Sequence, residues 1–194
     1  MLKRAFYVCA LVAGLTGLVA SSAHAVTVDA FANSSSGGIG SATGVFLTAG
    51  QAFTVTVPTD DLWSAGALPR WSNADGLVGN RVATGSDESG QAAGTLIGTD
   101  FGSWLQNGLS APYGSLVGRI GSGAFFFVGT SFSGIANASG QLSFYYWDSN
   151  NSDNTQFVTA TIAAVPGPIV GAGLPGLLAA LGFIVWRRKR RIAA

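Results

Sequence analysis

The chain has one cysteine and one histidine, and both lie within its first 25 residues, at Cys9 and His24. A disulfide needs two cysteines, and the common zinc and copper sites need His or Cys ligands. Catalysis by a Ser-His-Asp triad or by a Cys-His pair also needs a histidine. The chain from residue 26 onward can therefore form none of these sites.

Positive charge is scarce in the middle of the chain. Of ten Lys and Arg residues, only Arg70, Arg81 and Arg119 lie between residues 26 and 164, and the same stretch holds all nine Asp and Glu residues. Its net charge is −6, whereas the whole chain has a formal charge of +1. Nucleic-acid binding needs a row of cations to displace counterions from phosphate. We therefore expect no nucleic-acid partner.

Residues 26–164 also lack apolar residues at helical spacing over more than two turns. Short apolar or alternating runs bounded by turn residues occur instead, which is typical of antiparallel strands packed as a sandwich. Residues 58–112 follow no such pattern, and long irregular stretches of this kind often carry binding sites. The sequence predicts one all-β domain with strands at 26–31, 44–47, 52–57, 115–120, 124–128, 140–146 and 156–163.

Residues 1–25 have the form of a signal peptide. Lys3 and Arg4 precede an apolar run from residue 5 to residue 20, and Ala23 and Ala25 have the spacing of a signal-peptidase site. We expect cleavage between Ala25 and Val26. The export machinery and signal peptidase are then the first partners of the chain.

The C-terminal segment, residues 165–194, contains a long uncharged apolar run. The twenty residues from Gly167 to Trp186 carry no charge, and a helix of that length spans about 30 Å, the thickness of the hydrocarbon core of a bilayer. We predict one transmembrane helix at 169–186. The alternative is a buried helix of a soluble domain. A basic tail follows, and the positive-inside rule places it in the cytoplasm: Arg187, Arg188, Lys189, Arg190 and Arg191.

This topology places residues 26–164 on the periplasmic side of the inner membrane, as a single-pass ectodomain. The sequence Val165-Pro166-Gly167-Pro168 precedes the span. The order of short Pro-containing motif, span and basic tail resembles the PEP-CTERM sorting signals of exported bacterial proteins, with Gly167 in place of the usual Glu. The resemblance implies processing by an exosortase-type enzyme at these prolines, passage to the cell surface or secretion, and association with exopolysaccharide.

The residues after 147 form a stretch rich in side-chain oxygen atoms. Asp148 and Asp153 carry charge, and Asn150 and Asn154 offer neutral amide oxygens. Calcium takes six to eight hard oxygen ligands from carboxylates, amides and backbone carbonyls. The pattern indicates calcium. A solvated turn stabilised by its own Asp and Asn side chains is the alternative.

Four blocks of the sequence resemble the galactophilic, PA-I-type bacterial lectins: residues 47–57, 62–66, 113–121 and the stretch from Asp148 to Ile162. The resemblance implies a jelly-roll β-sandwich of galactose-binding type with one calcium ion that bridges protein and sugar hydroxyls. By position, Asp148 is the bidentate ligand, Asp153 and Asn154 are side-chain ligands, and Ala65 supplies a backbone carbonyl. A further backbone ligand is expected near Asn150.

Tryptophan offers a physical route to sugar binding, because an aromatic face stacks on the C–H side of a pyranose ring. We predict that Trp71 and Trp147 contact sugar. Trp71 is the stronger candidate because Arg70, Ser72 and Asn73 flank it in a stretch without regular pattern. The alternative for each tryptophan is that it fills the core.

No catalysis is expected. Glycosidases need only two carboxylates, but Asp60-Asp61 and Asp87-Glu88 are adjacent pairs on turns, where neighbouring side chains diverge. The sequence as a whole predicts an exported protein of the cell envelope or extracellular matrix that binds carbohydrate through calcium. The alternative is a structural matrix or coat component that self-associates and has no specific sugar ligand.

Overall fold

Strands with alternating apolar residues dominate residues 23–165, the part of the chain that the computed structural model describes. In the last strand, β14 (Phe157–Ala164), Val158, Ala160 and Ile162 are buried, and the residues between them are at least partly exposed. This alternation arises because successive side chains of a strand point to opposite faces. No helix occurs among the described residues.

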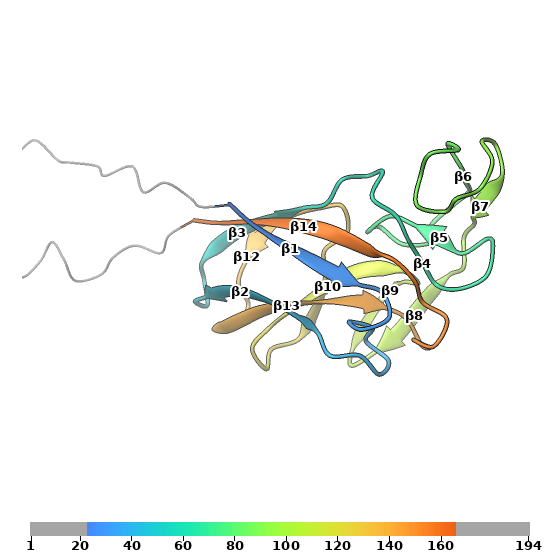
Figure 1. Cartoon of the computed structure of the whole chain (residues 1–194). Helices are drawn as coiled ribbons and strands as arrows, with labels where there is room; N and C mark the ends of the chain where they lie inside the picture. Colours follow the sequence, from blue (N-terminus) through green and yellow to red (C-terminus); the bar gives the residue numbers. More distant parts are fainter. Residues whose placement is uncertain (1–22, 166–194) are drawn as a thin grey trace, which may run out of the picture.

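Two four-stranded antiparallel sheets pack face to face (Figure 1). In spatial order, the first sheet contains β1 (Ala23–Asp29), β14, β3 (Ala52–Thr56) and β12 (Ser131–Ile135). The second sheet contains β11 (Phe125–Phe127), β10 (Ser115–Ile120), β13 (Gly140–Trp147) and β2 (Ser41–Leu47).

The order of the eight strands is that of a jelly roll. Along the chain the strands alternate between the sheets, except that β10 and β11 are neighbours in one sheet, and every pairing is antiparallel. The prediction of an all-β antiparallel sandwich is confirmed, and each of the seven expected strands corresponds to a strand of the two sheets. The sequence reading missed β12, an edge strand that pairs with β3.

The main core lies between the two sheets. Its largest side chains are fully buried and include Phe53, Phe144, Tyr146 and Trp63. Trp63 lies in the short strand β4 (Trp63–Ser64), and its ring meets that of Tyr146 edge-on at a centroid distance of 4.6 Å. The indole N–H of Trp63 donates to Asn73 O and Gly114 O, at 3.2 and 2.8 Å. This tryptophan joins the irregular region to the sandwich.

The region from residue 58 to residue 112 folds into three short antiparallel pairs at one end of the sandwich (Figure 1). The first pair joins β4 to β5 (Trp71–Ser72), and the second joins β6 (Arg81–Val82) to β7 (Leu96–Gly98). The third is a hairpin of β8 (Ser103–Gln106) and β9 (Leu109–Pro112). Its turn residues Asn107 and Gly108 have φ values of 51° and 84°, as a two-residue hairpin turn requires.

The two ends of the described chain lie side by side at the end of the sandwich opposite to these loops (Figure 1). Ala23 pairs with Ala163, and the expected cleavage point between Ala25 and Val26 falls within β1. Residues 23–165 include no helix with the length and apolarity needed to span a bilayer. The predicted span and basic tail, the processing residues 166–168 and residues 1–22 of the signal peptide lie outside the described residues, so these assignments remain predictions.

Asp61 connects the loop after β3 to β14, because the backbone N–H of Thr159 donates to Asp61 Oδ2 at 2.7 Å. Partial burial raises the pKa of Asp61 above 3.8, with a smaller increase from Asp60, and the Thr159 hydrogen bond partly opposes this shift. A carboxyl group with a raised folded-state pKa binds protons more readily in the folded chain. The Asp61 carboxyl group therefore lowers the free energy of unfolding as pH rises from 3.8, its pKa in the unfolded chain, through its higher pKa in the folded chain.

We expect Asp61→Asn to be slightly more stable than the wild type at pH 7, by about 0.5 kcal/mol or less because solvent screens this half-exposed group. The amide oxygen still accepts the Thr159 hydrogen bond, while the partly desolvated charge is gone. Urea unfolding at pH 7 and at about pH 3 measures the effect, and the gain should vanish at the lower pH. A variant that is less stable than wild type at pH 7 would show that the charge itself stabilises the fold.

Candidate functional site

The oxygen-rich stretch forms the connection between β13 and β14, at the end of the sandwich away from the described chain termini (Figure 1). An isolated antiparallel bridge between Ser64 and Thr155 holds this loop against the end of β4. The Ser35 hydroxyl fixes the other side, because it donates to Asp148 O at 3.1 Å and accepts from Asp148 N at 3.2 Å. The loop is therefore anchored by two segments that are distant in sequence.

Asp148 is a buried carboxylate with only 5% of its surface exposed. Its Oδ1 accepts hydrogen bonds from the backbone N–H groups of Ser149 and Asn150, at 2.6 and 3.4 Å. Burial raises the pKa of Asp148, those two hydrogen bonds lower it, and the negative charge of Asp153 raises it further. No cationic side chain is among the groups that set this pKa. A buried carboxylate in such surroundings favours a bound cation.

Asn154 lies beside Asp148 and is also buried, with 4% of its surface exposed. Its side chain lowers the pKa of Asp148 through a hydrogen bond, and its Nδ2 donates to Ala30 O at 3.2 Å. Asn154 Oδ1 has no hydrogen-bond partner within residues 23–165. Buried polar atoms are almost always paired. An unpaired amide oxygen on a residue beside a buried carboxylate has the chemistry of a cation ligand.

Asp148, Asp153 and Asn154 form a group that we call the Asp148 cluster. Asp153 lies at its edge, where its side chain is 42% exposed. Its Oδ1 accepts from Asn150 Nδ2 at 2.8 Å, and its Oδ2 is 3.7 Å from Arg70 Nη1. A β-carbon on Gly66, which has a φ of 112°, would overlap Asp153 Oδ2. The carboxylate of Asp153 is thus in close contact with the backbone that follows Ala65, as the expected Ala65 carbonyl ligand requires.

The predicted ligands do not all contribute in the same way. The side-chain oxygen of Asn150 accepts from the N–H and the hydroxyl of Ser152, at 3.2 and 3.0 Å, which leaves its backbone carbonyl as the donor implied by the resemblance. Among the described residues, no three His, Cys, Asp or Glu side chains come together at one place, so an ion bound here would also need amide and backbone oxygens. The donors present are two carboxylates, one amide oxygen and backbone carbonyls. That set fits calcium better than a soft metal.

Sequence reasoning missed two residues at the edge of this site, Arg70 and Phe101. The Arg70 guanidinium lies over the Phe101 ring, 4.7 Å from its centroid, and it neutralises part of the Asp153 charge. Phe101 is 45% exposed. Neither has a local pattern that marks it, because both come from the irregular region, where the tertiary fold brings Arg70 to Asp153 and Phe101 to Arg70.

The prediction that Trp147 contacts sugar is wrong, because its side chain is fully buried. It packs with Ala111 and Val117 in a separate cluster beneath the β8–β9 hairpin, and its indole N–H donates to Trp104 O at 2.9 Å. Trp147 therefore fills the core.

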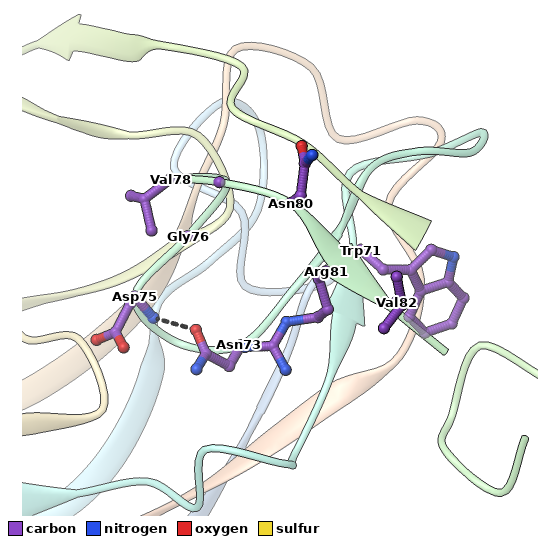
Figure 2. A pocket seen from close by; sticks show the side chains of 9 residues that line it. Trp71, Asn73, Asp75, Gly76, Val78, Asn80, Arg81 and Val82 are labelled. Carbon is purple, nitrogen blue, oxygen red and sulfur yellow. Dashed lines mark hydrogen bonds between the residues drawn. The ribbon is translucent and has the colours of Figure 1, made fainter. Parts of the chain in front are cut away.

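Trp71 lies on the opposite face of the β4–β5 pair from the Asp148 cluster. Its neighbours Arg70 and Ser72 point to the cluster, where Arg70 meets Asp153 and the Ser72 hydroxyl approaches Gly114 beside Tyr146. Because side chains alternate along a strand, Trp71 points away. It lines a different cavity, drawn in Figure 2. The structure therefore does not bring Trp71 together with the predicted metal ligands.

The chain matches no family model and no curated protein. Among solved structures it is similar to a domain described as "EclA N-terminal domain; PllA-like lectin". The TM-score is 0.47 and the sequence identity is 20%, over 73% of this chain and 96% of that chain.

Proposed function

We propose that the jelly-roll domain is a non-catalytic, calcium-dependent carbohydrate-binding module of an exported protein. The observation that carries this proposal is a buried carboxylate, Asp148, beside a buried Asn154 whose Oδ1 has no hydrogen-bond partner within residues 23–165. Both groups lose hydration on folding, and neither gains a cationic partner from residues 23–165, which is costly unless a cation binds. Calcium supplies that charge and accepts the oxygen ligands available here.

In this proposal Asp148, Asp153 and Asn154 hold the ion through their side chains, and Ala65 and Asn150 contribute backbone carbonyls. These five residues leave room in a coordination shell of six to eight oxygens for two hydroxyl groups of a sugar. The Arg70 guanidinium, 39% exposed and held over Phe101, lies where it can donate hydrogen bonds to a further hydroxyl. The module would then read the spacing of hydroxyl groups on one face of a sugar ring.

The placement of the site supports a surface role. The end of β14 leads towards the predicted membrane anchor, and the 148–156 loop lies at the other end of the sandwich (Figure 1). An ectodomain tethered through residue 165 would present this loop away from the membrane. We therefore propose that the module binds polysaccharide of the cell envelope or extracellular matrix.

The absence of catalysis is also part of the proposal, and the contacts of the two acidic pairs support it. Asp61 accepts the Thr159 N–H in a bond that joins two backbone segments. Asp87 accepts hydrogen bonds from the N–H and hydroxyl of Thr84, at 2.5 and 3.0 Å, and from the Ser89 hydroxyl. These bonds are typical of carboxylates that stabilise loops.

Calorimetric titration of the purified chain with calcium chloride, followed by glycan-array binding with calcium or with EDTA, tests this function. We expect one saturable calcium site with a dissociation constant of about 10⁻⁴–10⁻³ M, as in other extracellular modules, and a set of glycans that bind only with calcium. Magnesium is the control, because its smaller ion demands octahedral geometry and should bind more weakly. Absence of calcium binding, together with concentration-dependent association and no glycan signal, would instead support the structural-component alternative.

A further inference from the structure

A cavity of about 380 Å³ lies between Trp71 of β5 and the segment from Asn73 to Val82 (Figure 2), and none of the expected calcium ligands lines it. Its lining includes Trp71, Asn73, Asp75, Asn80, Arg81 and Val82. The volume is within the range of roughly 300–1,000 Å³ found for small-molecule sites. Its lining combines one large aromatic ring with several polar side chains and differs from the all-oxygen donor set at Asp148.

The Trp71 indole forms one wall of the cavity, and the protein holds it firmly. Trp71 is partly buried and packs against Leu62, Ala83 and Ile97, a small cluster separate from the main core. Figure 2 shows the indole beside Val82 at one end of the cavity. A rigid aromatic wall loses little conformational entropy on binding, and its face attracts polarised C–H groups.

The Arg81 side chain lines the same cavity, where it extends towards Asn73 (Figure 2), and it has N–H donors without a partner in the described residues. Arg81 forms no salt bridge within the part of the chain that the structure describes, where the single ion pair is that of Arg70 with Asp153. Its one hydrogen bond is a long one, from Nη1 to Thr59 O at 3.5 Å. A guanidinium has five N–H donors, so several remain for a ligand.

Of the other polar residues that line the cavity, Asp75 and Asn73 are held by hydrogen bonds within the protein, and Asn80 has a donor available for a ligand. Both Asp75 oxygens accept from the Thr130 hydroxyl at 3.0 Å, and Asp75 Oδ1 also accepts the Thr130 N–H at 2.7 Å. Asn73 is buried and its Oδ1 accepts the Asp75 N–H at 3.0 Å, the bond drawn in Figure 2. Asn80 lies at the exposed rim, where its Oδ1 accepts from the Thr99 hydroxyl at 3.2 Å and its Nδ2 can donate to a ligand.

We propose that this cavity is a second saccharide-binding site, one that works without calcium. A single pyranose unit of a polysaccharide stacks its C–H face on Trp71, and its hydroxyl or carboxylate oxygens accept from Arg81 and Asn80. The site is independent of the function proposed for Asp148, because none of the expected calcium ligands lines it. Two sites on one domain would raise the avidity for a polysaccharide chain, since binding at one site increases the effective concentration at the other.

The test is titration of the purified full chain, in EDTA, with tetrasaccharides of neutral hexoses and of uronic acids. Two variants are designed to block the site and leave unchanged the cluster of Leu62, Ala83 and Ile97 that packs against Trp71. Arg81→Ala removes the charged donor, and Gly79→Leu places a side chain at the cavity lining, where a β-carbon meets no atom within 4 Å and φ is not positive. Arg119→Ala is the matched control, because Arg119 lies on β10 and lines a different cavity.

We expect at least one tetrasaccharide to bind in EDTA, and the neutral and acidic arms identify which kind of pyranose it carries. Arg81→Ala should weaken that binding about tenfold or more, the loss that follows removal of one charge-assisted hydrogen bond. Gly79→Leu should weaken it by a similar factor, because the added side chain occupies space that the ligand would fill. Arg119→Ala and Asp148→Asn should leave it unchanged. The proposal is overturned if no tetrasaccharide binds in EDTA, or if binding survives both cavity variants. If the wild-type chain binds a tetrasaccharide in EDTA but shows no calcium-dependent glycan binding, the result contradicts the Asp148 site and not this cavity.

Discussion

Replacing Asp148 with Asn should remove most of the rise in melting temperature that calcium gives to the wild-type chain. At a calcium concentration one hundred times its dissociation constant, a bound ion stabilises the folded state by about 2.7 kcal/mol. Loss of one of the two carboxylate ligands should weaken binding about 100-fold, which is also about 2.7 kcal/mol. At the same calcium concentration the variant would gain only about 0.4 kcal/mol.

The Asn variant is preferred to Ala because it keeps the local hydrogen bonds. Asp148 Oδ1 accepts from the N–H groups of Ser149 and Asn150, and an amide oxygen can accept both. Without calcium, the variant should melt at the wild-type temperature or above it, because a buried charge next to Asp153 is removed. The two proteins should therefore reverse their order of stability when calcium is added.

Glu88→Gln is the control for the change in net charge. Glu88 is exposed in the loop between β6 and β7, outside the Asp148 cluster, so its variant should show the full calcium shift. Thermal unfolding of the three proteins, each with calcium and with EDTA, measures the effect. If calcium raised the melting temperature of Asp148→Asn and of the wild type equally, Asp148 would not be a calcium ligand.

The seven strands predicted from the sequence were recognisable because each alternates apolar and polar residues or forms a short apolar run between turns. β12 has the sequence Ser-Phe-Ser-Gly-Ile, in which Gly134 replaces the side chain that would complete the pattern. A β-carbon at Gly134 would lie 2.7 Å from the Phe132 ring, so the ring occupies the space that the glycine leaves. A pattern based on side chains cannot detect a strand position filled by a neighbour's ring.

The error at Trp147 has a different cause. Tyr146 and Trp147 are consecutive and point to opposite faces of β13, yet both are fully buried. The second face is covered by the β8–β9 hairpin, some forty residues earlier in the chain. A hairpin signal was present in the sequence as Asn107-Gly108, a pair that favours tight two-residue turns. The sequence could have shown that this hairpin exists, but not which face of the sandwich it covers.

The candidate metal site was predictable in part. The Asp148–Asn154 segment was recognised because its candidate ligands are close in sequence, and the structure places Asp153 and Asn154 beside Asp148. The separation of Trp71 from these residues was not predictable. The separation depends on which of the two residues of β5, Trp71 or Ser72, faces the Asp148 cluster. A strand of two residues has no alternating pattern from which the sequence could predict this.

Truncation of Trp63 to Ala should be among the most destabilising substitutions in the domain, at about 4 kcal/mol or more. Trp63 is fully buried, meets Tyr146 edge-on and donates to Asn73 O and Gly114 O. Deletion of a buried Trp side chain typically costs about 3–5 kcal/mol, and loss of its N–H deprives buried carbonyls of a donor. Since domains of this size are stable by about 5–15 kcal/mol, much of the total would be lost.

Trp63→Phe separates the two contributions, because it keeps most of the apolar volume and removes only the N–H. We expect it to cost about 2 kcal/mol, and Phe46→Ala, at a side chain that is 72% exposed, to cost about 0.5 kcal/mol or less. Urea midpoints at constant slope measure all three. Because Trp63 links the backbone before Ala65 to the strand that ends at Trp147, Trp63→Phe should also weaken calcium binding. If Trp63→Ala cost no more than Phe46→Ala, Trp63 would not be the residue that joins the loops to the sandwich.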